Sequence, residues 1–194
     1  MNVERLSMYH ISRQGNWKVG DILTAGVEDN EFWSICKDYN RTFKVDGREM
    51  TVFEMINNVE TFEVSQQNIR FLYMVIKRIS KEYAFYVREQ IFEAVRRESF
   101  PQLPSRQKCL WVCEEDQISF WADSKTDKEP RRLLTLELTG DLFCGDDYWL
   151  DADTFSSLTY TDRAHHYWAG ELSDDPHKEF LFTGTAVVKA IEEM

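Results

Sequence analysis

The apolar residues in the middle of the chain recur with the period of an α-helix. One stripe, at three- and four-residue steps, consists of Ile69, Leu72, Tyr73, Ile76, Ile79 and Tyr83. A second stripe follows with Ile91, Phe92 and Val95. Neither glycine nor proline occurs between Gly47 and Pro101, so no helix-breaking residue interrupts that interval. The pattern therefore predicts two or three helices over residues 51–99.

Alternating or continuous apolar runs outside this segment predict β-strands. The runs are Met8–Ile11, Lys108–Cys113, Ile118–Trp121, Leu134–Leu138 and Glu179–Val188. Glycines set their expected limits, because the fourth run ends at Gly140 and the last is interrupted at Gly184. A short helix is expected over residues 161–171. Strands on both sides of a helical block, without regular βαβ alternation, predict an α+β fold.

The length and the charge of the chain limit the classes of protein to which it can belong. A chain of 194 residues fits a single domain, 1–194, with a core of its own. The net charge of −11 argues against a protein that binds nucleic acids broadly through a basic surface. No apolar run approaches the ~18 residues of a membrane span, and the N-terminus has no apolar signal core. We therefore expect a cytoplasmic protein with no membrane partner and with its four cysteines reduced.

Three polar residues stand at positions from which they can act on a ligand. His10 lies in the first predicted strand, and its ring can both donate and accept hydrogen bonds. Arg106 follows two prolines that stiffen its loop, and a fixed guanidinium suits a phosphate group. Glu179 stands at the start of the last apolar run. Each also has a structural interpretation: a satisfied histidine, a solvated arginine in a connection, and a carboxylate at the edge of a strand.

Histidines and acidic residues elsewhere do not form a metal motif. His165 and His166 are adjacent and point in different directions on a helix, so they cannot easily share an ion. The aspartates after residue 140 lack the spacing of a calcium loop and predict solvated turns. The neighbouring Tyr167 and Trp168 suit either the core or a platform on which a ligand ring stacks. No metal cofactor is expected.

Several segments, in order along the whole chain, resemble the ADP-ribosyltransferase superfamily of the His-Tyr-Glu type. Tyr9–Ser12 is similar to its first strand, and Ser105–Trp111 lies where its second-motif strand lies. Leu134–Gly140, followed by Asp146 and Asp147, resembles its middle strand and the acidic turn after that strand. Glu179 before Phe180–Phe182 is similar to its last catalytic strand, in which a glutamate precedes an apolar run. The signatures also resemble an uncharacterised bacterial domain family that shares this fold.

The resemblance implies an ADP-ribosyltransferase-like split β-sheet core, with a helical insert after the first strands, and an enzyme that uses NAD as its substrate. Such an enzyme breaks the bond between nicotinamide and ribose through a cationic ribose transition state. The resemblance assigns Glu179 to stabilise that cation and to orient or deprotonate the acceptor. It assigns the remaining contacts with NAD to His10, Ser105, Arg106, Tyr167 and Trp168.

The expected function is therefore mono-ADP-ribosylation of a protein or a single-stranded nucleic acid, by a bacterial toxin or phage-defence effector. A neutralising antitoxin is a further expected partner. An inactive binding module of the same fold is the first alternative. The central tyrosine of the family has no clear counterpart in this chain, because Trp111 or Cys113 stands near its position. An RNA 2′-phosphotransferase-like enzyme is the second alternative. It also uses NAD, but its basic acceptor groove has little counterpart in this acidic chain.

Overall fold

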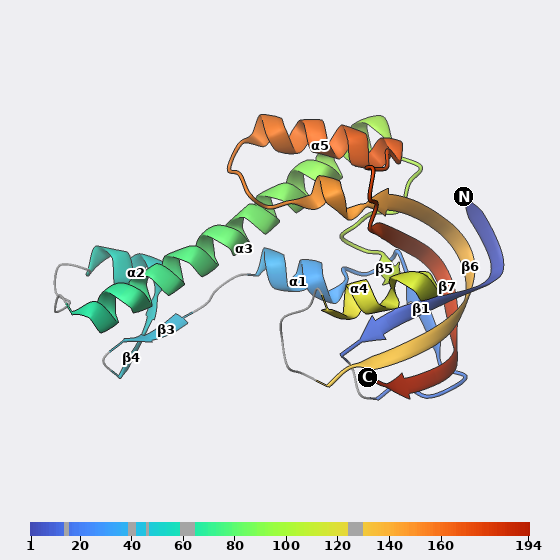
Figure 1. Cartoon of the computed structure of the whole chain (residues 1–194), viewed down its shortest axis with the longest axis horizontal. Helices are drawn as coiled ribbons and strands as arrows, with labels where there is room; N and C mark the ends of the chain where they lie inside the picture. The colour runs from blue at the N-terminus through green and yellow to red at the C-terminus, as the bar shows by residue number, and fades with distance from the viewer. Residues whose placement is uncertain (14–15, 39–41, 46, 59–64, 124–129) are drawn as a thin grey trace.

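The computed structural model describes residues 1–13, 16–38, 42–45, 47–58, 65–123 and 130–194. It consists of a β-rich body and an arm that projects from the body (Figure 1). Along the chain the elements are β1 (Asn2–Ser12), β2 (Ile22–Ala25), α1 (Glu31–Lys37), β3 (Thr42–Val45), β4 (Arg48–Thr51), α2 (Val52–Asn57), α3 (Gln66–Ser99), β5 (Leu110–Val112), the 3-10 helix η2 (Glu115–Gln117), α4 (Ile118–Asp123), β6 (Arg132–Asp146), the 3-10 helix η3 (Asp147–Leu150), α5 (Ser157–Ala169) and β7 (Lys178–Glu193). The predicted α+β class is confirmed.

The body is built on an antiparallel sheet in the order β1–β6–β7–β2, in which β5 also pairs with β7. A bridge between Tyr9 of β1 and Cys113, just after β5, closes this sheet on itself. Its two backbone hydrogen bonds measure 3.0 and 2.8 Å. The three strands β7, β5 and β1 therefore lie side by side, although β1 and β7 are at opposite ends of the chain.

Both long strands pass through the glycines at which the sequence predicted an end or a break. Gly140 and Gly184 pair directly across the ladder, with φ values of +153° and +136° that only glycine adopts readily. A Cβ on Gly140 would lie 2.2 Å from the carbonyl oxygen of Thr183. The pair bends β6 and β7 together without interrupting their hydrogen bonds. The predicted limits at these glycines are therefore wrong.

The apolar run at the start of β7 is buried on both faces. Phe180 and Phe182 belong to one core cluster with the leucines of β6, whereas Leu181 belongs to a second cluster beneath α3 and α5. Successive side chains of a strand point to opposite faces, so a continuous apolar run is what two covered faces require. This second cluster is the wall against which the candidate site is built.

Two helices differ from their sequence-based limits or type. The segment Ile118–Asp123 forms α4, where a strand was predicted, because the 3-10 turn η2 leads directly into a helical turn. Helix α5 begins at Ser157, four residues before the expected start at residue 161. The side chain of Ser156 caps it by accepting a hydrogen bond from the backbone of Thr159, and Gly170 ends it in a left-handed conformation.

The predicted helical segment 51–99 contains α2 and α3, and residues 59–64 between them lie outside the described part. The 34 residues of α3 span about 50 Å, so the helix links the body to the arm. Its first half, with α2 and the β3–β4 hairpin, forms the arm, and its second half packs on α5 (Figure 1). Within the described residues no helix is both long and apolar enough to cross a membrane.

Candidate functional site

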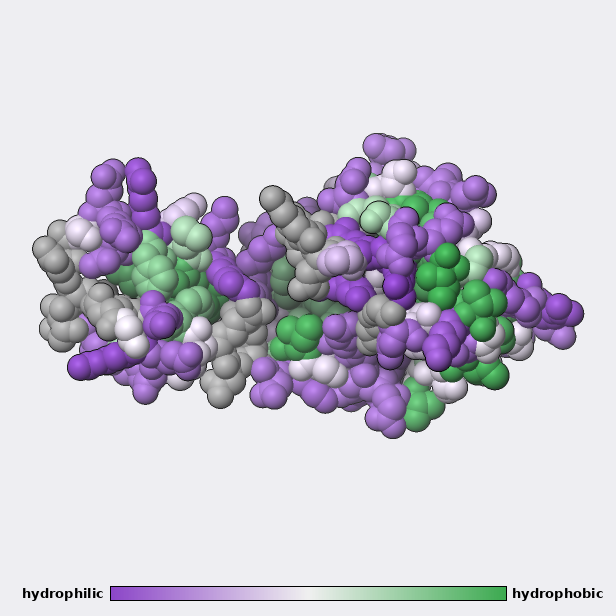
Figure 2. Space-filling model, turned by 90° about the horizontal axis from the view of Figure 1, so that it is seen from below, coloured by the Kyte–Doolittle hydropathy of each residue, from purple (hydrophilic) through white to green (hydrophobic). Residues whose placement is uncertain are grey.

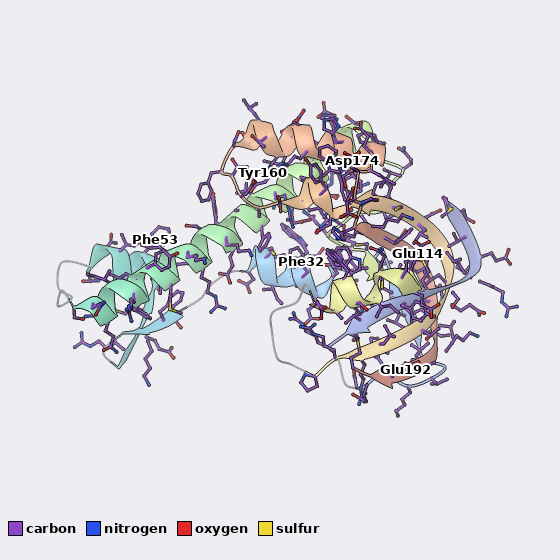
Figure 3. All side chains as sticks on the ribbon, in the orientation of Figure 1. Phe32, Phe53, Glu114, Tyr160, Asp174 and Glu192 are labelled. Atoms are coloured by element: carbon purple, nitrogen blue, oxygen red, sulfur yellow. The ribbon has the colours of Figure 1, made fainter. Side chains whose placement is uncertain are left out.

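A cavity of about 660 Å³ lies where the sheet meets α1 and α3. Polar and charged side chains line part of it, namely His10, Ser12, Arg13, Asn30, Glu31, Arg88, Arg106, Asp147 and Glu179. Aromatic side chains line another part, together with aliphatic ones; the aromatic residues are Tyr9, Trp17, Phe32, Phe85, Trp111 and Trp121. Phe32 points from α1 towards the strands (Figure 3), and its ring meets that of Trp111 edge to face at 5.7 Å. Flat apolar walls with a few fixed polar groups are typical of a pocket for a small ring-bearing ligand.

Glu179 reaches this cavity from the start of β7. It pairs with Gly145 of β6, so its side chain stands on the face covered by α3 and α5. Only 8% of the residue is exposed, yet it is part of the cavity wall. The interpretation of Glu179 as a solvated carboxylate at a strand edge is therefore wrong, because this residue is nearly buried.

Arg106 holds the Glu179 carboxylate in place. Its Nη1 donates to Glu179 Oε1 and, at 2.8 Å, to the hydroxyl of Tyr167. That hydroxyl in turn donates to Glu179 Oε1 at 2.7 Å. Both hydrogen bonds that the carboxylate accepts from described residues go to Oε1. The second oxygen, Oε2, is thus the one available to a hydroxyl group of a ligand.

The other side of the Arg106 guanidinium is bound by Glu89 of α3. Arg106 Nε and Nη2 donate to the two oxygens of Glu89 at 3.0 and 3.2 Å. Arg88 also donates to Glu89, at 2.7 Å, and its Nη1 donates to the carbonyl of Leu150. We call Arg88, Glu89, Arg106, Tyr167 and Glu179 the buried network. A fully paired set of buried charges fixes side-chain positions.

Burial and pairing oppose each other within the buried network. Burial alone would raise the pKa of Glu89, but the guanidinium groups of Arg106 and Arg88 outweigh it and hold that pKa below its usual value. Burial alone would lower the pKa of Arg106, but the Glu179 and Glu89 carboxylates raise it well above its usual range. Burial raises the pKa of the Tyr167 hydroxyl, which remains protonated and able to donate. At neutral pH Glu89 and Arg106 are therefore charged, and Tyr167 is neutral.

Gly145 allows Tyr167 to reach the network. A Cβ built on Gly145 would lie 2.4 Å from the Cε2 atom of the Tyr167 ring. The ring thus lies flat on β6, at the position where a side chain would otherwise stand opposite Glu179. Phe92 and Phe143 pack against its other sides at ring distances of 5.6 and 5.5 Å. The glycine is needed for close packing, which the sequence alone did not reveal.

Asp147 adds another carboxylate to the cavity wall. It follows Gly145 by two residues, and its backbone N–H donates to the carbonyl of His177 at 3.0 Å. Asp147 is the first residue of η3, just beyond the end of β6, and it lines the same cavity as Glu179. Its pKa is raised, first by burial and then by the Glu179 carboxylate. Among the described residues no side chain forms a hydrogen bond or ion pair with its carboxylate.

The other predicted NAD contacts have different roles in the structure. Ser105 donates to Glu93 at 2.9 Å, which fixes the turn before Arg106, and it is not part of the cavity wall. Trp168 is buried, and its indole donates to the carbonyl of Phe92 at 2.8 Å. Tyr167 is buried as well, so neither ring can stack on a ligand. The stacking role predicted for these two aromatic residues is wrong, because the core already uses both rings.

His10 does line the cavity. Its Nδ1 lies 2.8 Å from the carbonyl oxygen of Trp111, a contact that joins β1 to β5. Arg106 also lines the cavity, but each of its donor nitrogens already has a partner in the buried network. It therefore positions Glu179 and does not serve as a free phosphate clamp, which corrects the expectation for this residue.

Sequence reasoning missed Asp147 and Glu89. It treated the aspartates after residue 140 as solvated turns, and it took the second half of α3 as an apolar stripe. The available signal for Glu89 was the charged pair Arg88–Glu89 between the apolar residues Val87 and Ile91 of the helical segment. In the described residues no three His, Cys, Asp or Glu side chains are grouped as a metal site requires, and the four cysteines are free thiols.

Comparison with known proteins places the chain in a family. No curated protein matches the sequence. The family model described as "Protein of unknown function (DUF2441)" matches residues 8–193. This match spans the helical arm, the sheet and all the cavity residues named above. The chain therefore belongs to the DUF2441 family.

Proposed function

We propose that the protein is an NAD-dependent mono-ADP-ribosyltransferase that cleaves the nicotinamide–ribose bond. The observation that carries the proposal is the Glu179 carboxylate, fixed by Arg106 and Tyr167 in the wall of an aromatic cavity. Its Oε2 atom is available to bind a ribose hydroxyl and to face a cationic carbon. The volume of about 660 Å³ is in the range of pockets that enclose small organic ligands.

The arrangement of the strands gives further support. The resemblance to ADP-ribosyltransferases rested on three segments that are far apart in the sequence: Tyr9–Ser12, Ser105–Trp111 and the start of β7 at Glu179. In the structure β5 pairs with β7 and meets β1 through the Tyr9–Cys113 bridge. All three segments contribute to the same cavity wall.

The charges around the cavity suit a cationic transition state. Nicotinamide leaves NAD as a neutral molecule, and the positive charge then develops on the ribose. Three carboxylates, Glu89, Glu179 and Asp147, lie with two guanidinium groups, Arg88 and Arg106. Glu31 and Arg13 add one charge of each sign to the cavity wall. With all of these groups ionised the site carries one net negative charge, and the buried network among them is fixed by its own hydrogen bonds. Preorganised charge of this kind stabilises a transition state because it need not reorganise during the reaction.

Two of the cavity carboxylates, Glu179 and Asp147, divide the chemistry. Glu179 is held by Arg106 and Tyr167, so it stabilises the ribosyl cation and orients the ribose. Asp147 has no such partner among the described residues and can accept a proton. As the acceptor oxygen or nitrogen bonds to the ribose carbon, the C–N bond to nicotinamide breaks and the acceptor proton passes to Asp147. The products are neutral nicotinamide, the ADP-ribosylated acceptor and one proton, which Asp147 later releases to water.

Nicotinamide release from NAD tests the proposal. The Glu179→Gln variant keeps the shape of the side chain and its hydrogen bonds with the buried network, but loses the negative charge. We expect its nicotinamide release to fall by about 100-fold or more while NAD binding, measured by calorimetry, persists. Glu192→Gln is the matched control, because Glu192 is exposed at the other end of β7 (Figure 3).

Three outcomes decide the proposal. Loss of release in the Glu179 variant alone supports it. Wild-type protein that neither binds NAD at millimolar concentration nor releases nicotinamide overturns it. Wild-type protein that binds NAD without turnover identifies instead a binding module that uses the same cavity. Labelled NAD then shows whether ADP-ribose is transferred to protein, to nucleic acid or to water.

A further inference from the structure

The N-terminal part of α3, as far as Tyr83, exposes a row of large apolar side chains. Ile69, Tyr73, Ile76 and Tyr83 are each 57–63% exposed, whereas the neighbouring Val75 is buried. We call these four exposed side chains the α3 seam. Apolar side chains gather on the arm among polar ones, at the left of Figure 2. Contiguous apolar surface that the fold leaves uncovered marks an interaction site.

The spacing of the α3 seam identifies the shape of its occupant. The steps from residue 69 to 73, 76 and 83 are four, three and seven residues, with the half-buried Ser80 at the position between. This is the heptad spacing of a helix that pairs with another helix. Apart from Met74, which is exposed on the far side of Arg70 and Lys77, the exposed apolar side chains of this segment form a narrow stripe. A helix that lies in a membrane surface presents a broad apolar face instead. The geometry therefore suits a single α-helix.

The charge beside the α3 seam identifies the chemistry of that helix. Residues 66–83 contain four basic side chains and one acidic one, in a chain with net charge −11. Arg70 and Lys77 lie seven residues apart along one flank of the seam, and Lys81 follows one turn later. All three are exposed, and no described residue forms an ion pair with Arg70 or Lys77. A partner with carboxylates along its facing edge would complement this flank.

We propose that the α3 seam docks an amphipathic α-helix of another protein, with an apolar stripe at heptad spacing and an acidic flank. This docking does not depend on the proposed enzymatic function. A second copy of the chain fits less well. In a two-fold antiparallel pair of α3 helices each flank faces its own copy, so Arg70 and Lys77 would face the same basic residues. A nucleic acid would use the basic flank and leave Ile69 and Ile76 unburied.

The docked helix would end beside the cavity. Two residues beyond Tyr83, Phe85 lines both the main cavity and an adjoining one of about 300 Å³, whose wall also includes Lys81 and Arg88. Tyr83 and Tyr86 are in ring contact, and Tyr86 stacks on Trp33 of α1 at 5.7 Å. The seam thus leads along one rigid helix to the residues that line the cavity.

A designed peptide tests the docking on the full chain. The probe is a four-heptad peptide with Leu at both core positions of each heptad and Glu at both flanking positions. Its counterpart has Lys in place of Glu. We expect the wild-type protein to bind the acidic peptide at least tenfold more tightly than the basic one, as measured by fluorescence anisotropy, with an affinity that falls as salt rises.

Variants separate the apolar and charged parts of the α3 seam. Ile76→Asp should weaken binding of the acidic peptide at least tenfold, because it places a carboxylate in the apolar stripe. The double variant Arg70→Glu and Lys77→Glu should reverse the preference in favour of the basic peptide. Arg78→Glu is the matched control, because Arg78 carries the same charge on the same helix but points away from the seam. It should leave the preference unchanged.

Each other result overturns the proposal. Equal affinity for the two peptides, or an Arg78 variant that changes binding as much as the double variant, would show that the α3 seam does not bind an acidic helix selectively. Wild-type dimers in light scattering that Ile76→Asp dissociates would assign the seam to a second copy. Stronger binding to vesicles with 30% anionic lipid, or to a single-stranded oligonucleotide, than to the acidic peptide would assign it to those ligands. Far-UV circular dichroism establishes that each variant remains folded.

Discussion

The two halves of α3 are parts of one helix with opposite surroundings. In the first half large apolar side chains such as Ile69 and Ile76 are exposed, and the neighbouring Lys77 has no ion-pair partner among described residues. In the second half the charged Arg88 and Glu89 are buried beside Phe92. The first half forms the arm together with α2 and the β3–β4 hairpin, and the second half lies against α5 and the sheet (Figure 1).

This difference shows what burial depends on. A charged side chain can be buried where its partners are fixed by other elements, as Glu89 is by Arg106 of the loop before β5. An apolar side chain stays exposed where none of the described helices and strands of the chain covers it, as on the α3 seam. Exposed apolar residues and buried charged residues are both exceptions to the usual pattern, and each is a candidate functional feature.

Removal of Arg106 should have the largest effect on stability. Arg106→Met leaves the buried carboxylates of Glu89 and Glu179 without their shared cation, so we expect a loss of about 3–5 kcal/mol in the free energy of unfolding by urea. Arg97→Met is the control, because that side chain is 66% exposed and pairs with Glu93 at the surface. It should cost at most about 1 kcal/mol. Equal losses would mean that burial of the network contributes nothing.

Loss of Asp147 should affect activity and leave the fold intact. If Asp147 is the base, Asp147→Asn should reduce transfer to a protonated acceptor by about 100-fold. Azide has no proton to lose, so the variant should keep transfer to azide at near the wild-type rate. Equal losses with both acceptors would exclude Asp147 as the base. Asp151→Asn, which changes a neighbouring carboxylate of the adjoining cavity only, is the control.

The pH dependence of the same site follows from the raised pKa of Asp147. The base acts in its ionised form, so kcat/KM should rise as pH increases through that pKa, at a pH above the usual value of about 3.9 for aspartate. The folded protein holds this proton more tightly than the unfolded chain. Its contribution to stability is therefore complete at low pH and is lost as pH rises through the folded pKa. Both effects should disappear in the Asp147→Asn variant.

A side chain at Gly145 should have an intermediate effect on stability. Gly145→Ala brings a methyl group into the Tyr167 ring, and we expect a cost of about 1–3 kcal/mol together with displacement of the hydroxyl from Glu179. In a Tyr167→Ala background the same substitution should cost less than about 0.5 kcal/mol, because the ring is gone. A double-mutant cycle by urea denaturation measures the difference. Additive costs would contradict the contact.

The smallest effect is expected on the arm. Ile76→Ala removes an exposed side chain of the α3 seam, so the free energy of unfolding should change by less than about 0.5 kcal/mol. The adjacent Val75 is buried, and Val75→Ala should cost more than about 1 kcal/mol. A large cost for Ile76→Ala would show that the seam is covered within the chain itself.

Much of the architecture could be predicted from local patterns. The period of Ile69–Tyr83 predicts a helix, and the run Phe180–Phe182 predicts a strand, because each depends on repeats within a few residues. The type of α4 and the passage of β6 and β7 through Gly140 and Gly184 could not be predicted. They depend on a preceding turn and on a glycine pair that forms only when two distant segments meet.

The sequence by itself determined the α+β class, the helical middle of the chain, the last strand and the position of Glu179 at its start. Only the tertiary structure decided which side chains meet. It placed Glu89 and Asp147 near Glu179, enclosed Tyr167 and Trp168 in the core, and left the α3 seam uncovered. The reason is physical. Helix and strand periods are local properties of the chain, whereas burial and ion pairing depend on residues from tens to more than a hundred positions apart, which come together only in the fold.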